Sequence, residues 1–171
     1  RIETPTVKGL RRKGEAWSHC VDPDRGIHYV RVTQFNRNTE PDLRQALADL
    51  QSTGLNGLIL DLRDNPGGAL PAAVGMSDLF LDEGVIVSVR PRRGSEEVFN
   101  ATAPGTLPDF PMIVLVNGNS ASASEIVAGA LQDNHRAVVL GTRSYGKGSV
   151  QEVRELRHRA GTLKYTAAYY H

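Results

Sequence analysis

The chain has 171 residues, of which 40% are hydrophobic and 23% charged, and its formal net charge at pH 7 is +1. A nearly balanced charge argues against a dedicated nucleic-acid binder, and the length suits a single hydrophobic core. Cys20 is the sole cysteine, so an intrachain disulfide and a cysteine-rich metal site are both excluded. The sequence contains neither a signal-peptide pattern nor an apolar run of about 18 residues.

The first half of the chain predicts strands, a helix and a further strand. Alternation predicts strands over residues 16–20 and 26–35, joined by a turn at 22–26. A helix is expected to begin at Thr39 and to end at Gly54. Residues 55–62 are almost continuously apolar, as in a strand buried on both faces. The side chains expected in the core are Ile27, Tyr29, Phe35, Leu43, Ala46, Leu47 and Leu50.

The second half continues the alternation of strands and helices. A helix is expected over residues 69–80, followed by strands at 85–89 and 96–100 and a proline-rich loop at 101–111. A strand is predicted at 112–116, and a helix follows it. Further strands are predicted at 137–140, which should be buried, and from Leu163 onward. Strands alternating with helices imply a single α/β domain with parallel pairing and right-handed crossovers.

A cluster of serines lies between the strand at 112–116 and the helix that follows it. The sequence there is Asn117-Gly-Asn-Ser-Ala-Ser-Ala-Ser-Glu-Ile126. A hydroxyl at the start of a helix lies at the positive end of the helix dipole, where a nucleophile is favoured. Ser122 and Glu125 also match a capping box, which needs no catalytic role. The stretch by itself leaves both interpretations open.

Two glycine-rich turns are candidates to complete a site. In the segment Arg63-Asp-Asn-Pro-Gly-Gly68, paired glycines after a buried strand can present a backbone N–H to a substrate oxyanion, although a plain turn explains them equally well. The segment 141–148 nearly matches a phosphate-binding loop, but Gly148 replaces the hydroxyl residue that the motif requires. Removing water from around Lys147 would disfavour its charged form and yield an amine able to accept a proton, whereas a solvated lysine would have no such role.

Histidine is not a convincing base for Ser122. His135 follows it by 13 residues on the same predicted helix, a separation of roughly 20 Å at the rise of an α-helix. The remaining histidines have no sequence context that indicates a triad: His19, His28, His158 and His171. If Ser122 is a nucleophile, a lysine is therefore the natural candidate for its base.

Three segments in this order resemble the carboxyl-terminal processing proteases, also called tail-specific proteases. They are Asp61-Leu-Arg-Asp-Asn-Pro-Gly-Gly68, Ser120-Ala-Ser-Ala-Ser-Glu-Ile126 and Tyr145-Gly-Lys-Gly-Ser-Val-Gln151. The resemblance runs from about Gly26 to the end of the chain. It implies a serine peptidase with a Ser/Lys dyad and an α/β crotonase-like (ClpP/crotonase) core of stacked ββα units. The residues that match the family's functional positions are Ser122 as nucleophile, Lys147 as general base, Gln151 orienting the lysine, and Gly68 and Ala123 as oxyanion-hole donors.

The resemblance also carries expectations about partners and location. The substrate would be a polypeptide, bound as an extended strand and cut near its C-terminus, without metal, cofactor or nucleic acid. Residues 1–171 would form the protease core, with 1–15 resembling the exit from a PDZ-type domain of a longer parent chain. Both ends of the chain look cut, and the expected location is extracytoplasmic: periplasm, lumen or cell envelope.

Two other functions remain compatible with the same fold. One is a catalytically silent binding scaffold, in which replacing Ser122 would change nothing measurable. The other is a crotonase-like enzyme acting on acyl-CoA thioesters, with Gly68 in its oxyanion hole and no special role for Lys147.

Overall fold

The computed structural model describes residues 5–14, 16–91, 94–155 and 161–170. Its helices are α1 (Thr39–Ser52), α2 (Leu70–Asp78) and α3 (Ala123–Asp133). The strands of the first half are β1 (Val7–Lys8), β2 (Arg11–Lys13), β3 (Ala16–Ser18), β4 (Cys20–Asp22), β5 (Ile27–Val32) and β6 (Gly57–Asp61). Those of the second half are β7 (Val85–Pro91), β8 (Glu97–Asn100), β9 (Met112–Val116), β10 (Val138–Gly141), β11 (Ser149–Glu155) and β12 (Thr162–Tyr170).

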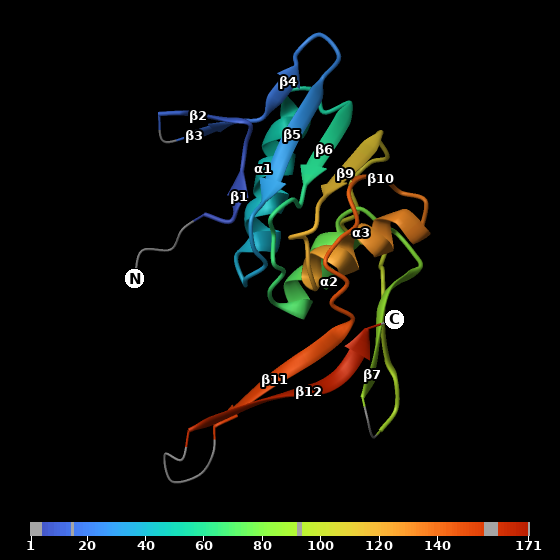
Figure 1. Ribbon diagram of the computed structural model, residues 1–171. Coiled ribbons are helices and arrows are strands. Elements are labelled where there is room, and N and C mark those ends of the chain that lie inside the picture. Colours follow the sequence, from blue (N-terminus) through green and yellow to red (C-terminus); the bar gives the residue numbers. More distant parts are fainter. Residues whose placement is uncertain (1–4, 15, 92–93, 156–160, 171) are drawn as a thin grey trace.

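The larger of the two main sheets contains six strands in the order β1-β5-β6-β9-β10, with β4 also paired to β5. Strands β5, β6, β9 and β10 run parallel, whereas β1 and β4 are antiparallel to β5. Helices α1 and α3 connect neighbouring parallel strands, and α2 follows β6 (Figure 1). The mixed α/β fold with parallel pairing predicted from the sequence is confirmed. The ends of β6 and β9 consequently lie at the same edge of this sheet.

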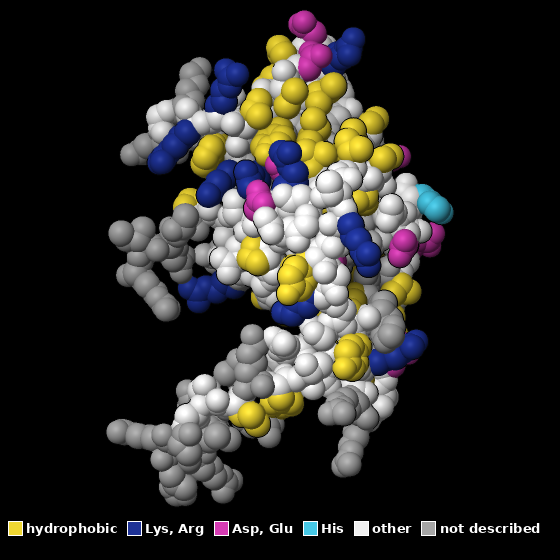
Figure 2. Space-filling view, viewed as in Figure 1, with side chains coloured by type: hydrophobic (Ala, Val, Ile, Leu, Met, Phe, Trp, Pro, Cys, Tyr) yellow, Lys and Arg dark blue, Asp and Glu magenta, His cyan; other side chains and the backbone are white. Residues whose placement is uncertain are grey.

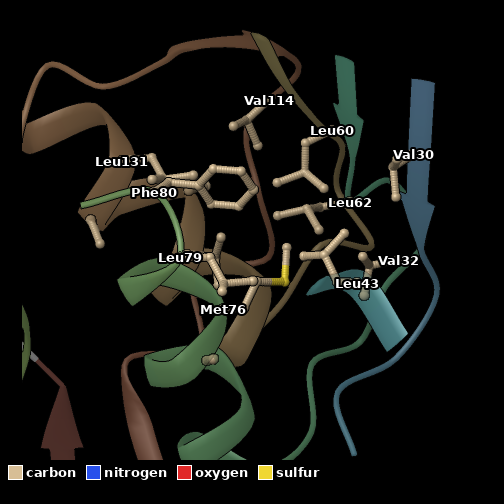
Figure 3. Close-up of a cluster of buried hydrophobic side chains, with 14 of the residues drawn as sticks. Val30, Val32, Leu43, Leu60, Leu62, Met76, Leu79, Phe80, Val114 and Leu131 are labelled. Atoms are coloured by element: carbon tan, nitrogen blue, oxygen red, sulfur yellow. The ribbon is translucent and has the colours of Figure 1, made fainter. Parts of the chain in front are cut away.

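The hydrophobic core lies between this sheet and the three helices. Figure 3 shows side chains from both layers meeting there, each at most 2% exposed: Val30, Val32, Leu60, Leu62 and Val114 on the sheet side, and Leu43, Met76, Leu79, Phe80 and Leu131 on the helix side. Burial of one such side chain stabilises a fold by about 1.5–3 kcal/mol. The core therefore fixes the positions of β6 and β9, and with them the points at which the chain leaves the sheet after each strand.

The predicted core face of β5 was partly wrong. Phe35 is buried as expected, but Ile27 and Tyr29 are only half-buried, and His28, Val30 and Val32 face the helices instead. Successive residues of a strand point to opposite faces, and this segment has apolar residues on both, so its composition does not select one.

The outer face of the large sheet is apolar and not covered by a helix. Tyr29, Ile59, Ile113 and Val138 lie in register across four strands, and Figure 2 shows apolar side chains gathered over this face. The prediction that residues 137–140 form a buried strand was also wrong in its burial, since Val138 is 66% and Leu140 57% exposed. Among the described strands, β10 pairs only with β9, which makes it an edge strand.

The second main sheet is antiparallel throughout, with the order β11-β12-β7-β8. It extends away from the large sheet as a twisted ribbon, and its strand β7 contacts α3 (Figure 1). The segment between β10 and β11 crosses from one sheet to the other past the start of α3. Lys147 lies in this crossing segment.

Candidate active site

The three serines before and within the start of α3 have different environments. Ser120 and Ser124 are fully buried, and their hydroxyls donate hydrogen bonds to the carbonyl oxygens of Leu62 (2.8 Å) and Asn65 (2.9 Å). Ser122, between them, is 7% exposed and lines a cavity. Ser120 and Ser124 therefore hold the start of α3 against the turn after β6 by hydrogen bonds, whereas the side chain of Ser122 faces the cavity.

Ser122 has an unusual backbone conformation, with φ 56° and ψ −114°. A residue with a side chain adopts positive φ only at a cost of about 1–3 kcal/mol, and such strain is often found where a side chain is presented for chemistry. The conformation occurs at a sharp strand-to-helix connection, the arrangement that exposes the nucleophile in α/β-hydrolases. The hydrogen bonds of the neighbouring serines hold the connection in this shape.

The turn after β6, here called the Asn65 turn (residues 62–68), packs directly against this connection. Asn65 is fully buried; its Nδ2 donates to the Val32 carbonyl and its Oδ1 accepts from Gly67 N–H, both at 2.9 Å. Its carbonyl oxygen accepts from Ala121 N–H at 3.0 Å. One asparagine therefore connects β5, the glycine pair and the residue before Ser122.

The glycine pair lies against Ser122 because only glycine fits there. A Cβ on Gly67 would lie 2.8 Å from the Cβ of Ser122 and 2.9 Å from the nitrogen of Ala123. Gly68 has φ 150° and bridges to Phe35. Among the described residues, neither Gly68 N–H nor Ala123 N–H has an acceptor. The two amides expected to form the oxyanion hole are thus unpaired and belong to segments in contact with each other.

Two carboxylates stabilise the outside of the Asn65 turn. Asp64 accepts from the side-chain amides of Asn119 and Asn117, each at 2.9 Å, and these bonds hold its pKa below the usual range. Burial would raise the pKa of Asp61, but hydrogen bonds from Arg63 and Tyr29 lower it on balance. Burial and the neighbouring Asp61 raise the pKa of Tyr29 to about 12. Asp61 and Asp64 thus both have structural partners.

Glu125 makes the capping bond expected of it, because its Oε2 accepts from Ser122 N–H at 2.7 Å. The same carboxylate also accepts three bonds from the segment 142–148, here called the Lys147 loop. The donors are the hydroxyl of Ser144 (2.7 Å), Gly146 N–H (2.5 Å) and Lys147 N–H (2.9 Å). Burial would raise the pKa of Glu125, and these hydrogen bonds lower it on balance.

A cavity of about 340 Å³ brings Ser122, Glu125 and Lys147 together. Its remaining wall is largely apolar and includes Ile86, Val87, Ile126 and Ala130. Lys147 is half-buried, and its Nζ has no hydrogen bond or ion pair with any described residue. The structure therefore places the predicted nucleophile and the predicted base on one cavity, without a hydrogen bond between their side chains.

Tyr170 is a residue of this cavity that sequence reasoning missed. Its N–H donates to the Gly148 carbonyl at 3.0 Å, and its backbone pairs with Val89 of β7. Burial raises the pKa of its phenol, and a hydrogen bond with the Ser122 hydroxyl opposes that rise. The apolar alternation near the end of the chain predicted the strand, but no local signal linked its last residues to Ser122.

Gln151 lies outside the cavity that contains Ser122. It is exposed, follows a bulge in β11 at Val150/Gln151, and lines a second cavity of about 930 Å³ on the other side of Lys147. No hydrogen bond joins its side chain to Lys147 among the described residues. Lys147 lines both cavities, the one with the predicted nucleophile and the one with Gln151.

None of the described histidines lines the Ser122 cavity. His135 is exposed and lines a different cavity, His28 is buried, and His19 is hydrogen-bonded to the Tyr29 carbonyl. His158 and His171 lie outside the described residues. Across the described ranges, no group of three or more His, Cys, Asp and Glu side chains is arranged to hold a metal ion. Nor does that part of the chain contain a helix long and apolar enough to cross a membrane.

Comparison with known proteins defines the class of this chain. The profile of Peptidase family S41 matches residues 26–171, so the chain belongs to that peptidase family. It is 46% identical over 164 residues to the carboxy-terminal-processing protease of Bartonella bacilliformis, covering 93% of this chain and 37% of that protein. It is 44% identical to the carboxyl-terminal-processing protease of Synechocystis sp., covering 86% of this chain and 34% of the relative.

A solved structure agrees with this assignment. The photosystem II D1 C-terminal processing protease superposes with a TM-score of 0.77 at 38% identity, covering 85% of this chain and 37% of that one. The chain therefore spans about a third of the length of these relatives. The resemblance to carboxyl-terminal processing proteases inferred from three short segments is confirmed at the level of the family.

Proposed function

We propose that this chain is the catalytic core of a serine endopeptidase that cleaves polypeptides near their C-terminus through an acyl-enzyme. The observation that supports it most is the difference between the three serines. Ser120 and Ser124 are committed to carbonyl acceptors, whereas Ser122 has a strained backbone and faces a cavity that Lys147 also lines. A capping role accounts for the position of Ser122 but not for its exposure to a cavity beside a lysine.

Acylation begins with the proposed base. The neutral amine of Lys147 accepts the proton of the Ser122 hydroxyl, and the oxygen attacks the scissile carbonyl carbon. Gly68 and Ala123 N–H, which lack acceptors among the described residues, donate to the oxyanion of the tetrahedral intermediate. The C–N bond then breaks, and the Lys147 ammonium gives its proton to the leaving amine. A peptide with a new N-terminus leaves, and the acyl group stays on Ser122.

Deacylation repeats the same proton transfers with water. Lys147 accepts a proton from a water molecule, the hydroxide attacks the ester carbonyl, and the bond to Ser122 breaks as its oxygen recovers the proton. In this mechanism Gln151 orients the amine of Lys147 from the second cavity, which both residues line. Substrate binding must bring the amine within hydrogen-bond reach of Ser122 Oγ, because no such bond exists in this structure.

The substrate we infer is an extended polypeptide with an apolar residue before the cleaved bond. The cavity beside Ser122 is lined by Ile86, Val87 and Ile126, which suits an apolar side chain. Strand β11 begins two residues after Lys147 and lies at the edge of its sheet among the described strands. An extended peptide can therefore add to this edge and pass in front of Ser122.

The wider setting is part of the same proposal. The arrangement of parallel strands and helices fits a crotonase-like core of stacked ββα units. In the longer protein, a PDZ-type domain would present the substrate's C-terminus to this core. Curated relatives include a carboxyl-terminal-processing peptidase named as chloroplastic, from Arabidopsis thaliana, and we propose an extracytoplasmic location here as well. The reaction requires no metal, cofactor or nucleic acid.

The test is cleavage of β-casein, an unstructured polypeptide, between pH 6 and pH 10. The chain should cleave it, and both Ser122→Ala and Lys147→Ala should lower the rate at least about 1000-fold. Ser52→Ala in α1 and Lys8→Ala in β1 are matched controls away from the cavity and should cleave normally. Full activity of Lys147→Ala would refute the dyad. Inactivity of the unaltered chain, both alone and within the longer protein, would favour a binding scaffold, and turnover of an acyl-CoA thioester would favour the crotonase-like alternative.

A further inference from the structure

Four hydrogen-bond donors converge on the carboxylate of Glu125, and they come from two distant segments. Oε2 accepts from Ser122 N–H (2.7 Å) and Lys147 N–H (2.9 Å). Oε1 accepts from the Ser144 hydroxyl (2.7 Å) and Gly146 N–H (2.5 Å). A single oxygen atom is therefore bonded to the backbones of both residues proposed to carry the chemistry.

A helix cap does not require this arrangement. A glutamate at this position of a capping box satisfies one N–H, that of the residue at the helix start. Three of the four bonds of Glu125 instead reach residues 19, 21 and 22 positions along the chain. They are made by a side chain that is itself half-buried on the cavity wall. The excess of bonds to the Lys147 loop indicates a second role.

The Lys147 loop has few other contacts that could hold it. Its backbone donates from Thr142 to the Val116 carbonyl (3.4 Å) and from Tyr145 to the Ser120 carbonyl (3.0 Å), and the Gly148 carbonyl accepts from Tyr170 (3.0 Å). Tyr145 is 69% exposed, and a Cβ placed on Gly146 would meet no atom within 4 Å. Tight packing therefore does not fix the position of Lys147, and the bonds to Glu125 are its main support on the side facing Ser122.

We propose that Glu125 is the positioning residue of this site: its ionised carboxylate holds the backbone of Lys147 beside Ser122. The proposal rests on the proposed function, since it assigns the role relative to Lys147 as base. Glu125 does not touch the scissile bond in this scheme. It acts through the loop, and it sets the distance that the lysine amine must span to reach the serine hydroxyl.

Only a carboxylate of this length satisfies all four donors. An ionised carboxylate accepts through both oxygens, whereas a glutamine has one accepting oxygen and an NH₂ group that donates. In Glu125→Gln the NH₂ group must face two donors, either the pair at Oε1 or the pair at Oε2. In Glu125→Asp the side chain is one methylene shorter and cannot reach the loop while it caps α3. Both variants should therefore release the Lys147 loop and leave the apolar cavity wall in place.

The released loop should have a defined kinetic signature. We expect kcat of Glu125→Gln to fall about 10- to 100-fold at pH 7.5, with KM within about threefold, because the residues proposed to bind the substrate are unchanged. Simple destabilisation of the fold would also lower the urea midpoint of the variant, which is measured alongside the kinetics.

Two measurements on the 171-residue chain test the proposal independently. Hydrogen exchange followed by NMR reports the Gly146 and Lys147 amides, which should exchange at least about 10-fold faster in Glu125→Gln than in the unaltered chain. Cleavage of β-casein across pH 6 to 10 reports the kinetic effect. Glu40→Gln, the same substitution in the first turn of α1, is the matched control and should change neither measurement. If Glu125→Gln folds poorly, Ser144→Ala is the variant to use instead. It removes only one of the four bonds, so we expect a smaller change in both measurements.

The outcomes separate this proposal from the proposed function. Unchanged exchange of both amides, or wild-type cleavage by Glu125→Gln at pH 7.5, would overturn the positioning role while leaving a Ser/Lys peptidase intact. A rise in KM with kcat unchanged would also overturn it. If the unaltered chain and Ser122→Ala are equally inactive, both alone and within the longer protein, the proposed function fails, and with it the assignment relative to a base. Faster amide exchange in the variant would then show only that Glu125 fastens the loop.

Discussion

Two segments lie beside Ser122, here called its two walls, and they are built in different ways: the Asn65 turn packs against it through Gly67, and the Lys147 loop lines the same cavity. On one side, the Asn65 turn is fixed by fully buried groups: the side chain of Asn65 bonds to Val32 and Gly67, and two buried serines bond to carbonyls of the turn. On the other side, the Lys147 loop is half-exposed and depends on one carboxylate and three backbone bonds to other segments. Several independent buried hydrogen bonds hold the Asn65 turn in position, whereas the position of the Lys147 loop depends mainly on Glu125.

This difference matches the demands that peptide hydrolysis places on each wall. Oxyanion donors act by being correctly oriented before charge develops, which requires a rigid backbone. A proton acceptor needs only to come within reach once the substrate is bound, and loops that complete a site on binding are common. The lack of a hydrogen bond between the side chains of Ser122 and Lys147 fits this division, because the adjustable wall carries Lys147, the proposed base.

The largest effect should follow from disturbing the rigid wall at Gly67. In Gly67→Ala the new Cβ would lie 2.6 Å from the Ala121 carbonyl oxygen and 2.8 Å from the Ser122 Cβ, at a φ of 96° that disfavours alanine. We expect cleavage of β-casein to fall more than about 100-fold. Gly118→Ala, whose Cβ would meet only the Arg143 oxygen at 3.8 Å, is the control. Equal activities of the two variants would show that the wall is less rigid than inferred.

Removing the asparagine at the centre of the same wall should mainly reduce stability. Asn65→Ala leaves the Val32 carbonyl and Gly67 N–H without their present partners in a buried place. Each unsatisfied buried group costs about 1–3 kcal/mol, so the free energy of unfolding should fall by about 2–4 kcal/mol in urea titrations. Asn119→Ala at the exposed surface loses one bond to Asp64 and should cost less than about 1 kcal/mol. If Asn65→Ala also lowered the free energy of unfolding by less than about 1 kcal/mol, the central role of Asn65 would be contradicted.

Acidification should weaken both walls through their carboxylates. Asp61, Asp64 and Glu125 all have pKa values lowered in the folded chain. A lowered folded pKa adds stability that is fully present above the unfolded value, near 4, and is lost as the pH falls through the folded value. The urea midpoint should therefore be constant from about pH 6 to 7.5 and decrease below about pH 4. Asp61→Asn should flatten this dependence, and an unchanged slope would contradict the assigned partners.

The smallest effect is expected at Tyr170, which contacts the Lys147 loop and Ser122. Tyr170→Phe keeps the backbone bond to Gly148 and removes the phenol beside the Ser122 hydroxyl. One hydrogen bond that orients the nucleophile is worth about 0.5–1.5 kcal/mol, so kcat should fall roughly two- to tenfold without a change in melting temperature. Tyr169→Phe on the neighbouring, exposed position is the control. A higher kcat in Tyr170→Phe would show instead that the phenol competes with Lys147 for the serine.

Local sequence patterns predicted most of the secondary structure. The apolar run before Asn117 and the helical spacing after it placed β9 and α3, and the glycine pair after residue 62 placed the turn before α2. Three short segments were enough to identify the family. These features could be predicted because they depend on neighbours within a few residues, where periodicity, glycine conformation and capping act.

The remaining features depend on contacts between distant segments. The helices cover only one face of the sheet, and His28 and Val30 lie on that face. They are therefore buried in the core, whereas Ile27 and Tyr29 on the other face are not. The edge position of β10 left Val138 exposed although its composition suggested a buried strand. The link between Tyr170 and Ser122 joins residues 48 positions apart, brought together by the pairing of β12 with β7.

The sequence by itself determined which residue types stand at the site: a serine at a helix start, a lysine on a glycine-rich turn and paired glycines after a strand. The capping box with Glu125 marks Ser122 as the helix start, but without the family resemblance it does not identify Ser122, rather than Ser120 or Ser124, as the nucleophile. Tertiary structure separates them, since two of the hydroxyls meet carbonyl oxygens of the Asn65 turn and one does not. It also turns Glu125 from a cap into the contact between two loops, because hydrogen bonds at 2.5–2.9 Å require atoms that only folding brings together.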